Sequence, residues 1–212
     1  MDQAVEAVEK QPSDRARFIE KARASAAIVT TVADVEEAIA YTVDLCGKKR
    51  PCRSMLPGAP DADGPGKNLP KKIIAAPELA PGAYRLLREQ CAANGFDCID
   101  AKMRSFLSGI DIGFSHADLG IVETGTVVLD CPGEELRLAT MICETHVCVL
   151  PESNIVEDGF AAKSQILRFM HKTPNYTAFI TGPSRTADIE RVLAIGVHGP
   201  LELHILIIED RS

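Results

Sequence analysis

The feature that most constrains the fold is an alternation of strand-like and helix-like segments along the chain. Short β-branched or apolar runs are followed by longer stretches whose apolar side chains recur at the spacing of one helix face. Such alternation is typical of βαβ units, which build a parallel sheet with helices on both faces. We therefore predict an α/β fold with a mostly parallel sheet.

The first half of the chain carries clear helix boundaries. Ser13 is expected to cap a helix that leads into a strand at residues 27–31. Asp34, with Glu37 three residues on, resembles a capping box and begins an amphipathic helix that ends before Gly47. Further on we predict a strand at 73–75, a helix at 83–94 that stops at Gly95, and a strand at 96–99.

The second half contains two apolar runs, 119–122 and 126–129, which are separated only by a Glu-Thr-Gly turn. A tight turn or a kink between strands fits this pattern. The remaining expected elements are a strand at 146–150, a helix at 160–170 capped by Asp158, a strand at 177–181, a helix at 187–195 stopped by Gly196, and a closing strand at 203–208.

Residues 51–70 hold too many prolines and glycines for a regular element, so we predict a long surface loop. Its Gly66-Lys67 pair resembles the end of a phosphate-binding loop. Asp61 stands where that motif requires its first glycine, and Asn68 replaces the Ser or Thr that would bind magnesium. We reject the phosphate loop.

Composition excludes several classes of partner. A formal net charge of −7 opposes binding to a phosphate backbone, so we expect no nucleic-acid partner. No apolar run reaches the roughly 18 to 20 residues of a membrane span, and the first residues lack the profile of a signal peptide. These patterns predict a cytoplasmic protein without a membrane span.

The 7 cysteines form neither an even disulfide framework nor a C-x-x-C knuckle. We expect reduced thiols, with Cys91, Cys98 and Cys148 acting as small hydrophobic residues of the core. No G-x-G-x-x-G motif follows a strand. The chain is therefore predicted to bind no metal, iron-sulfur cluster or flavin of its own.

One candidate site is the turn after the strand at 177–181. If this turn lies at the carboxyl end of a parallel strand and opens a helix, then free amides, Ser184, Arg185 and Thr186 can hold a carboxylate or a phosphate. Alternatively, Ser184 or Thr186 only caps the helix and Asp188 complements its dipole. Spacing alone leaves both interpretations open.

The other candidate site is the turn between the two apolar runs. Glu123 can serve there as a nucleophile or a general base, and Gly125 would allow the close approach of a ligand. The alternative is an ordinary turn glutamate that faces water. Thr124 and Thr126 are equally plausible as turn formers and as ligand contacts.

Several strings of the sequence are similar to the lactate-utilisation (LUD) domain family, from about Ala16 to the C-terminus. They occur in the family's order: Ala117-Asp-Leu-Gly-Ile-Val-Glu-Thr-Gly-Thr-Val-Val-Leu, Arg137-Leu138, Thr145-His-Val, Gly182-Pro-Ser-Arg-Thr-Ala-Asp-Ile-Glu and Gly196-Val-His-Gly-Pro. A lone LUD domain without cysteine clusters, here expected over residues 1–212, resembles the C-type member of the family. Cys143-Glu144 stands where relatives commonly carry prolines, so we expect the pocket wall near His146 to differ.

The resemblance implies the sheet shared by ribose-phosphate isomerases, glucosamine-phosphate deaminases and CoA transferases. It also implies a component of a system that oxidises L-lactate to pyruvate with iron-sulfur partner subunits, and that binds a small carboxylate or acyl ligand. The resemblance favours a functional role for Glu123 and for residues 184–188 over a purely structural one. CoA transferases use a glutamate that attacks an acyl-CoA, and the comparison with Glu123 is an analogy at the level of the fold only.

His198 belongs to a matching string, yet a regular helix of about nine residues would carry it about 14 Å from Ser184. It is therefore either a ligand contact or part of a turn or a subunit contact. His171 and His204 are assigned no role.

Two other functions stay open. The chain can be a free-standing acyl or CoA transferase, or a hydrolase, that uses Glu123. It can also be a non-catalytic scaffold that docks an iron-sulfur partner. The sequence leaves open whether the chain is an enzyme, which ligand it binds, which electron acceptor it uses, and whether it forms a homo-oligomer.

Overall fold

The computed structural model describes residues 13–52, 71–106, 109–189, 192–195 and 199–210, with the backbone alone at 185–189 and 192–195. Six strands form a parallel sheet in the order β1-β12-β7-β4-β2-β3. Their bounds are β1 Ile28–Val32, β12 Glu202–Ile208, β7 Cys143–Pro151, β4 Ile110–His116, β2 Ile73–Ala75 and β3 Asp97–Ile99. The predicted α/β fold with a mostly parallel sheet is confirmed.

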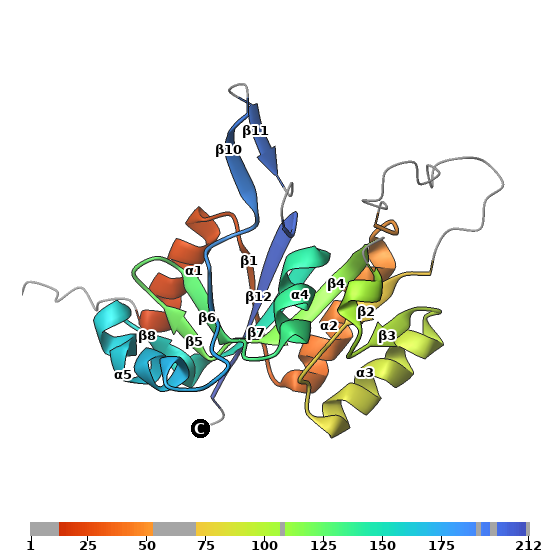
Figure 1. The fold of residues 1–212 in the computed structure, drawn as a ribbon, viewed down its shortest axis with the longest axis horizontal. Helices are drawn as coiled ribbons and strands as arrows, with labels where there is room; N and C mark the ends of the chain where they lie inside the picture. Colours follow the sequence, from red (N-terminus) through yellow and green to blue (C-terminus); the bar gives the residue numbers. More distant parts are fainter. Residues whose placement is uncertain (1–12, 53–70, 107–108, 190–191, 196–198, 211–212) are drawn as a thin grey trace, which may run out of the picture.

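Helices cover both faces of this sheet, as predicted (Figure 1). On one face, α2 Val35–Lys48 and α3 Pro81–Ala93 enclose a core with β2, β4 and β7. On the other face, α1 Asp14–Ala24 packs over β1, β12 and β7, and α4 Glu134–Ile142 packs on β4 and β7. The central strands are therefore buried on both sides, which explains their long apolar runs.

A second sheet adds a layer to the face that α1 covers. Its order is β8-β5-β6-β9, with β5 Leu119–Ile121, β6 Thr126–Asp130, β8 Ile155–Val156 and β9 Thr177–Ile180. β5 and β6 are antiparallel, which confirms the tight turn at 123–125. α5 Gly159–Met170 packs against the outer side of this sheet.

The expected helix caps are present. The side chains of Ser13, Asp34 and Asp158 accept hydrogen bonds from backbone amides at the starts of α1, α2 and α5. In the capping box the Glu37 carboxylate accepts from the amide of Ala33, 2.6 Å away. α2 continues through Gly47 to Lys48 instead of ending before the glycine.

The predicted helix at 187–195 is wrong. The chain instead forms an antiparallel hairpin of β10 Arg185–Ile189 and β11 Val192–Ile195, which projects from the body of the molecule (Figure 1). A helix of nine residues is marginal without an apolar face packed on the core, and the β-branched residues of this stretch favour a strand. No helix therefore begins at residues 184–186.

The position of one predicted strand also needs correction. The strand at 177–181 exists as β9, but it pairs antiparallel with β6 in the second sheet and not with the parallel sheet. The elements β4 and α4 were not predicted, although β4 is a central strand. Of the predicted loop at 51–70, residues 53–70 lie outside the described residues.

Candidate ligand-binding cavity

A cavity of about 370 Å³ lies between α4, the first residues of β7 and β12, and the segment from Tyr176 to Ser184. His146 and Leu203 line its floor and are paired in register near the starts of their strands. The cavity is therefore at the amino ends of the parallel strands. The expectation that the turn at 182–186 lies at a carboxyl end is wrong, because β9 runs in the second sheet.

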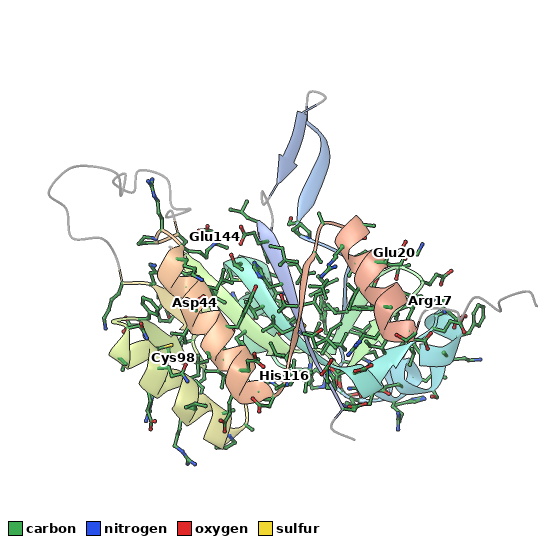
Figure 2. All side chains as sticks on the ribbon, turned by 180° about the vertical axis from the view of Figure 1, so that it is seen from behind. Arg17, Glu20, Asp44, Cys98, His116 and Glu144 are labelled. Carbon is green, nitrogen blue, oxygen red and sulfur yellow. The ribbon has the colours of Figure 1, made fainter. Side chains whose placement is uncertain are left out.

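Figure 2 shows the two ends of the parallel sheet by their labelled side chains. Glu144 marks the end where β7 begins, and His116 marks the end where β4 finishes. Glu144 follows Cys143, and both residues line a second cavity of about 380 Å³. The Met141 side chain borders both cavities, so the two lie side by side along the amino edge of the sheet.

His146 supplies a buried polar group to the cavity floor. It is 1% exposed, and its Nε2 lies 2.7 Å from the hydroxyl of Ser115. Its Nδ1 has no hydrogen-bond partner among the described residues. Burial lowers the pKa of His146 to about 4, so the imidazole is neutral at neutral pH.

Arg137 supplies a cation to the cavity wall. It projects from α4, and its guanidinium lies 5.0 Å from the centre of the Tyr176 ring, within the range of a cation–π contact. None of the ion pairs among the described residues includes Arg137. Its five N–H donors are therefore suited to a planar anion from outside the chain.

The segment at 181–184 closes the cavity on the opposite side. The Ser184 amide donates to the carbonyl of Pro200 at 2.9 Å, which holds this segment against the start of β12. At Gly199 a Cβ atom would lie 3.0 Å from the Cβ of Ser184, so glycine permits this close approach. The predicted residue Ser184 thus lines a cavity together with Arg137 and His146.

A short chain of hydroxyl groups connects the turn after β5 to the cavity. The Thr124 hydroxyl lies 2.6 Å from that of Thr126, which lies 2.7 Å from that of Thr181. Thr181 lines the cavity. Thr124 and Thr126 therefore support its rim without lining it.

Glu123 and Gly125 do not line either of these two cavities. Glu123 is exposed in its turn, and its amide donates to the carbonyl of Glu157 at 3.0 Å. Gly125 adopts a φ of +65°, and a Cβ there would lie 2.3 Å from the amide nitrogen of Ala22. The close approach at Gly125 is thus made by α1 and not by a ligand.

The remaining predicted site residues are less fully described. Arg185, Thr186 and Asp188 lie on β10, where the structure gives the backbone but not the side chains. His198 lies outside the described residues. Their roles stay predictions. The predicted anion site required a helix to begin at these residues, and a strand is present there instead.

Neither Arg137 nor His146 was predicted from the sequence as a site residue. Both belonged to strings that resembled a family, Arg137-Leu138 and Thr145-His-Val, and this was the signal that could have found them. Arg137 and His146 line the same cavity because of the position of α4 and the register of β7 with β12, and neither of these was predicted.

The described residues contain no group of three or more His, Cys, Asp or Glu side chains arranged to hold a metal ion. Within the same part of the chain, no helix is both long and apolar enough to cross a bilayer. The cysteines are free, and burial raises the pKa values of Cys131, Cys143 and Cys148 to about 12. These three thiols therefore stay protonated at neutral pH.

A known protein family matches almost the whole of the described fold. Residues 15–208 match the LUD domain. The chain belongs to the LUD domain family. All residues that line the first cavity fall within the matched range, so the cavity lies within the LUD domain of this chain.

Among its relatives, the LUD domain is 38% identical over 120 residues to lactate utilization protein C of Anoxybacillus flavithermus, covering 57% of this chain and 51% of the relative. It is 35% identical over 104 residues to lactate utilization protein C of Geobacillus kaustophilus, covering 48% and 43%. An uncharacterized protein of Neisseria meningitidis serogroup B is 37% identical over 110 residues, covering 52% and 47%. The chain spans about half the length of these curated relatives.

A solved structure supports the fold of the LUD domain. The crystal structure of a DUF162 family protein from Deinococcus radiodurans superposes with a TM-score of 0.53 and 16% sequence identity. The superposition covers 93% of this chain and 99% of the other.

Proposed function

We propose that this LUD domain binds a small carboxylate in the cavity between α4, β7, β12 and the 176–184 segment, as a component of a lactate-utilisation system. The observation that carries this proposal is the position of Arg137 on the cavity wall, with no carboxylate partner among the ion pairs of the described residues. A planar guanidinium can hold both oxygens of a carboxylate at once.

The surroundings of Arg137 support an acid with a short apolar part. Met141, Tyr176 and Phe179 line the cavity and are each about half exposed, at 51%, 46% and 52%. Exposed apolar side chains beside a cation are typical of a binding site. A cavity of about 370 Å³ also leaves room for an acyl tail longer than that of lactate.

The biological setting of the proposal comes from the relatives named lactate utilization protein C. In it, L-lactate is oxidised to pyruvate in the cytoplasm, and iron-sulfur partner subunits carry the electrons. The LUD domain holds a substrate or product acid and binds no metal or flavin itself. The high pKa values of its buried thiols support this division of roles, because thiolates are the form that binds iron and zinc.

Matched acids and amides test the carboxylate site. Thermal unfolding would be followed with millimolar propionate, lactate and pyruvate, and with the neutral compounds propionamide and lactamide. We expect the acids to raise the melting temperature and the amides to leave it unchanged, because ligands that bind only the folded state stabilise it. Equal shifts with acids and amides, or no shift with any acid, would contradict the proposal.

A second test addresses the proposed role in lactate utilisation. Deletion of the gene in its host should abolish growth on L-lactate as the carbon source while growth on pyruvate continues. The wild-type gene should restore growth, and the Arg137→Gln gene should restore it poorly. Normal growth of the deletion strain on L-lactate would exclude the proposed role.

A further inference from the structure

The cavity with Arg137 lies along the free edge of a strand. Among the described residues, β9 is the end strand of the second sheet and pairs with β6 alone. Every residue from Tyr176 to Ser184 lines the cavity. Neighbouring side chains of a strand point to opposite faces of the sheet, so a cavity on one face would be lined by alternate residues only. The cavity therefore runs along the edge of β9 and not over one of its faces.

The pairing of β9 with β6 indicates which backbone groups face this edge. The amide of Cys131 donates to the carbonyl of Tyr176 at 2.8 Å, so the Tyr176 carbonyl points towards β6. Backbone groups in an antiparallel ladder point alternately towards and away from the partner strand. The N–H and C=O groups of Thr177 and Phe179 therefore point away from β6, towards the free edge. No backbone hydrogen bond from outside the sheet reaches these groups in the described part of the chain.

One face of a helix forms the opposite wall of the cavity. Arg137, Thr140 and Met141 of α4 line it and follow the i, i+3, i+4 spacing of a single helix face. Met141 and Phe179 are both about half exposed, so the groove between the helix and the strand offers apolar surface as well as backbone groups. An exposed strand edge beside side-chain pockets binds an extended peptide as an added strand.

We propose that this groove binds the C-terminal end of an extended partner chain, with an apolar last residue and a free carboxylate that contacts Arg137. This inference rests on the proposed function, because the partner and a small acid share the site on Arg137 and compete for it. A chain end supplies a carboxylate in line with its backbone. An internal segment carries carboxylates only on side chains, which stand perpendicular to the sheet and away from its edge.

The position of Arg137 determines the direction of the added strand. Its guanidinium lies 5.0 Å from the centre of the Tyr176 ring, directly before β9 begins. A chain that ends beside the start of β9 runs antiparallel to it, and such a chain exchanges backbone hydrogen bonds with Thr177 and Phe179. The exposed Tyr176 ring and Met141, one turn after Arg137 on α4, favour an apolar last residue.

Calorimetric titration of the wild-type chain with two matched peptides tests the docking. The probe is an acetylated tetrapeptide of alternating threonine and valine that ends in valine with a free carboxylate, and its match ends in an amide. We expect the peptide acid to bind at least roughly tenfold more tightly than propionate, because it adds backbone hydrogen bonds and apolar contacts. The peptide amide should bind at least roughly tenfold more weakly than the peptide acid. Equal binding of the two peptides would assign the groove to an internal segment and overturn the inference.

Propionate in the same titrations separates this inference from the proposed function. If neither propionate nor the peptide acid binds, the proposed function fails and this inference fails with it. If propionate binds and the peptide acid binds no more tightly, the carboxylate site stands and this inference alone is overturned. Saturating propionate should weaken the binding of the peptide acid, and an unchanged peptide affinity would overturn the shared site on Arg137.

Two further changes test the edge of β9 itself. Methylation of all amide nitrogens of the peptide acid removes its donors and should reduce its affinity to that of propionate. In the chain, Phe179→Pro removes the N–H that points to the edge and leaves the ladder with β6, whereas the control Phe179→Ala keeps this N–H. Phe179→Pro should bind the peptide acid roughly tenfold more weakly than Phe179→Ala, with equal propionate binding. A methylated peptide that binds as tightly as its parent would overturn the inference, whether or not Phe179→Pro folds.

Sedimentation velocity at the concentrations of the titrations tests another occupant of the edge, a second copy of the chain. We expect Phe179→Pro and the wild type to sediment alike, because the edge is reserved for a partner chain. A dimer that is present in the wild type and lost in Phe179→Pro would assign the edge to a second copy and overturn the inference.

Discussion

At the scale of single residues, the buried His146 on the cavity floor makes the stability of the fold depend on pH. Its pKa falls from an ordinary 6.5 to about 4 on folding, because burial disfavours the charged ring. Between these two values the unfolded chain binds more protons than the folded chain, so stability rises with pH across this range. Stability is therefore complete above pH 6.5 and is lost as pH falls towards 4.

We predict that this residue accounts for a loss of about 3 kcal/mol in the free energy of unfolding between pH 6.5 and pH 4. Urea unfolding at several pH values would compare the wild type with His146→Asn, which has no titrating ring. The variant should lose less stability over this range, whereas His171→Gln, at an exposed position, should follow the wild type. Parallel pH curves for wild type and His146→Asn would refute the assignment.

Glu123 gives a second prediction at this scale. Its side chain is exposed and lines neither of the two cavities, so Glu123→Gln should change the free energy of unfolding by no more than about 0.5 kcal/mol. Pyruvate binding should also be unchanged. Hydroxylamine trapping with acyl-CoA esters would test the rival enzyme, and a covalent adduct at Glu123 would support that rival over the binding function.

The site was only partly predictable from residue types. Ser184 was selected as part of an anion site at a helix start, and it does line the cavity although no helix begins there. Arg137 and His146 were not selected, since an arginine on a helix and a histidine in a strand have no distinctive spacing. Their roles depend on contacts between segments that are distant in the chain.

At the scale of elements, the packing of α4 against β4 depends on Gly113. A Cβ at this position would lie 2.2 Å from the carbonyl oxygen of Ala139 and 2.9 Å from the sulfur of Cys143. We predict that Gly113→Ala lowers the free energy of unfolding by at least about 3 kcal/mol, because the backbone of α4 must shift. Chemical denaturation would measure this loss.

Gly47 is the matched control for that substitution. It lies within α2, and a Cβ there would have no atom within 4 Å. Gly47→Ala should therefore stabilise the chain by up to about 1 kcal/mol, since alanine favours the helix. Equal effects at Gly47 and Gly113 would show that α4 does not pack closely on β4.

Local sequence patterns predicted most helices and strands, but they missed elements whose formation depends on tertiary contacts. Side-chain caps identified the starts of α1, α2 and α5, because capping is a local interaction. β4 was missed since Asp111, Ser115 and His116 interrupt its apolar run. The Asp111 carboxylate accepts from the amides of Cys52 and Ile73, each at 2.7 Å, so hydrogen bonds from distant backbone satisfy this buried side chain.

At the scale of the whole molecule, the second sheet determines where the ligand site lies. The sequence predicted the strand at 177–181 but not its partner, and a strand placed in the parallel sheet would have put residues 181–184 at the carboxyl edge. Pairing with β6 instead brings this segment to the amino ends of β7 and β12. The periodicity of a short segment does not indicate which distant strand it pairs with, so the pairing of β9 with β6 could not be predicted.

The most direct test of this account is titration calorimetry of pyruvate against the wild type, Arg137→Gln and the control Arg168→Gln, whose arginine is exposed on α5 and does not line the cavity. A charge-assisted hydrogen bond contributes about 1.5–3 kcal/mol, so Arg137→Gln should bind pyruvate roughly ten- to a hundredfold more weakly. Arg168→Gln should bind as the wild type does. Equal affinities for the wild type and Arg137→Gln, with both proteins fully folded, would contradict a carboxylate site in this cavity.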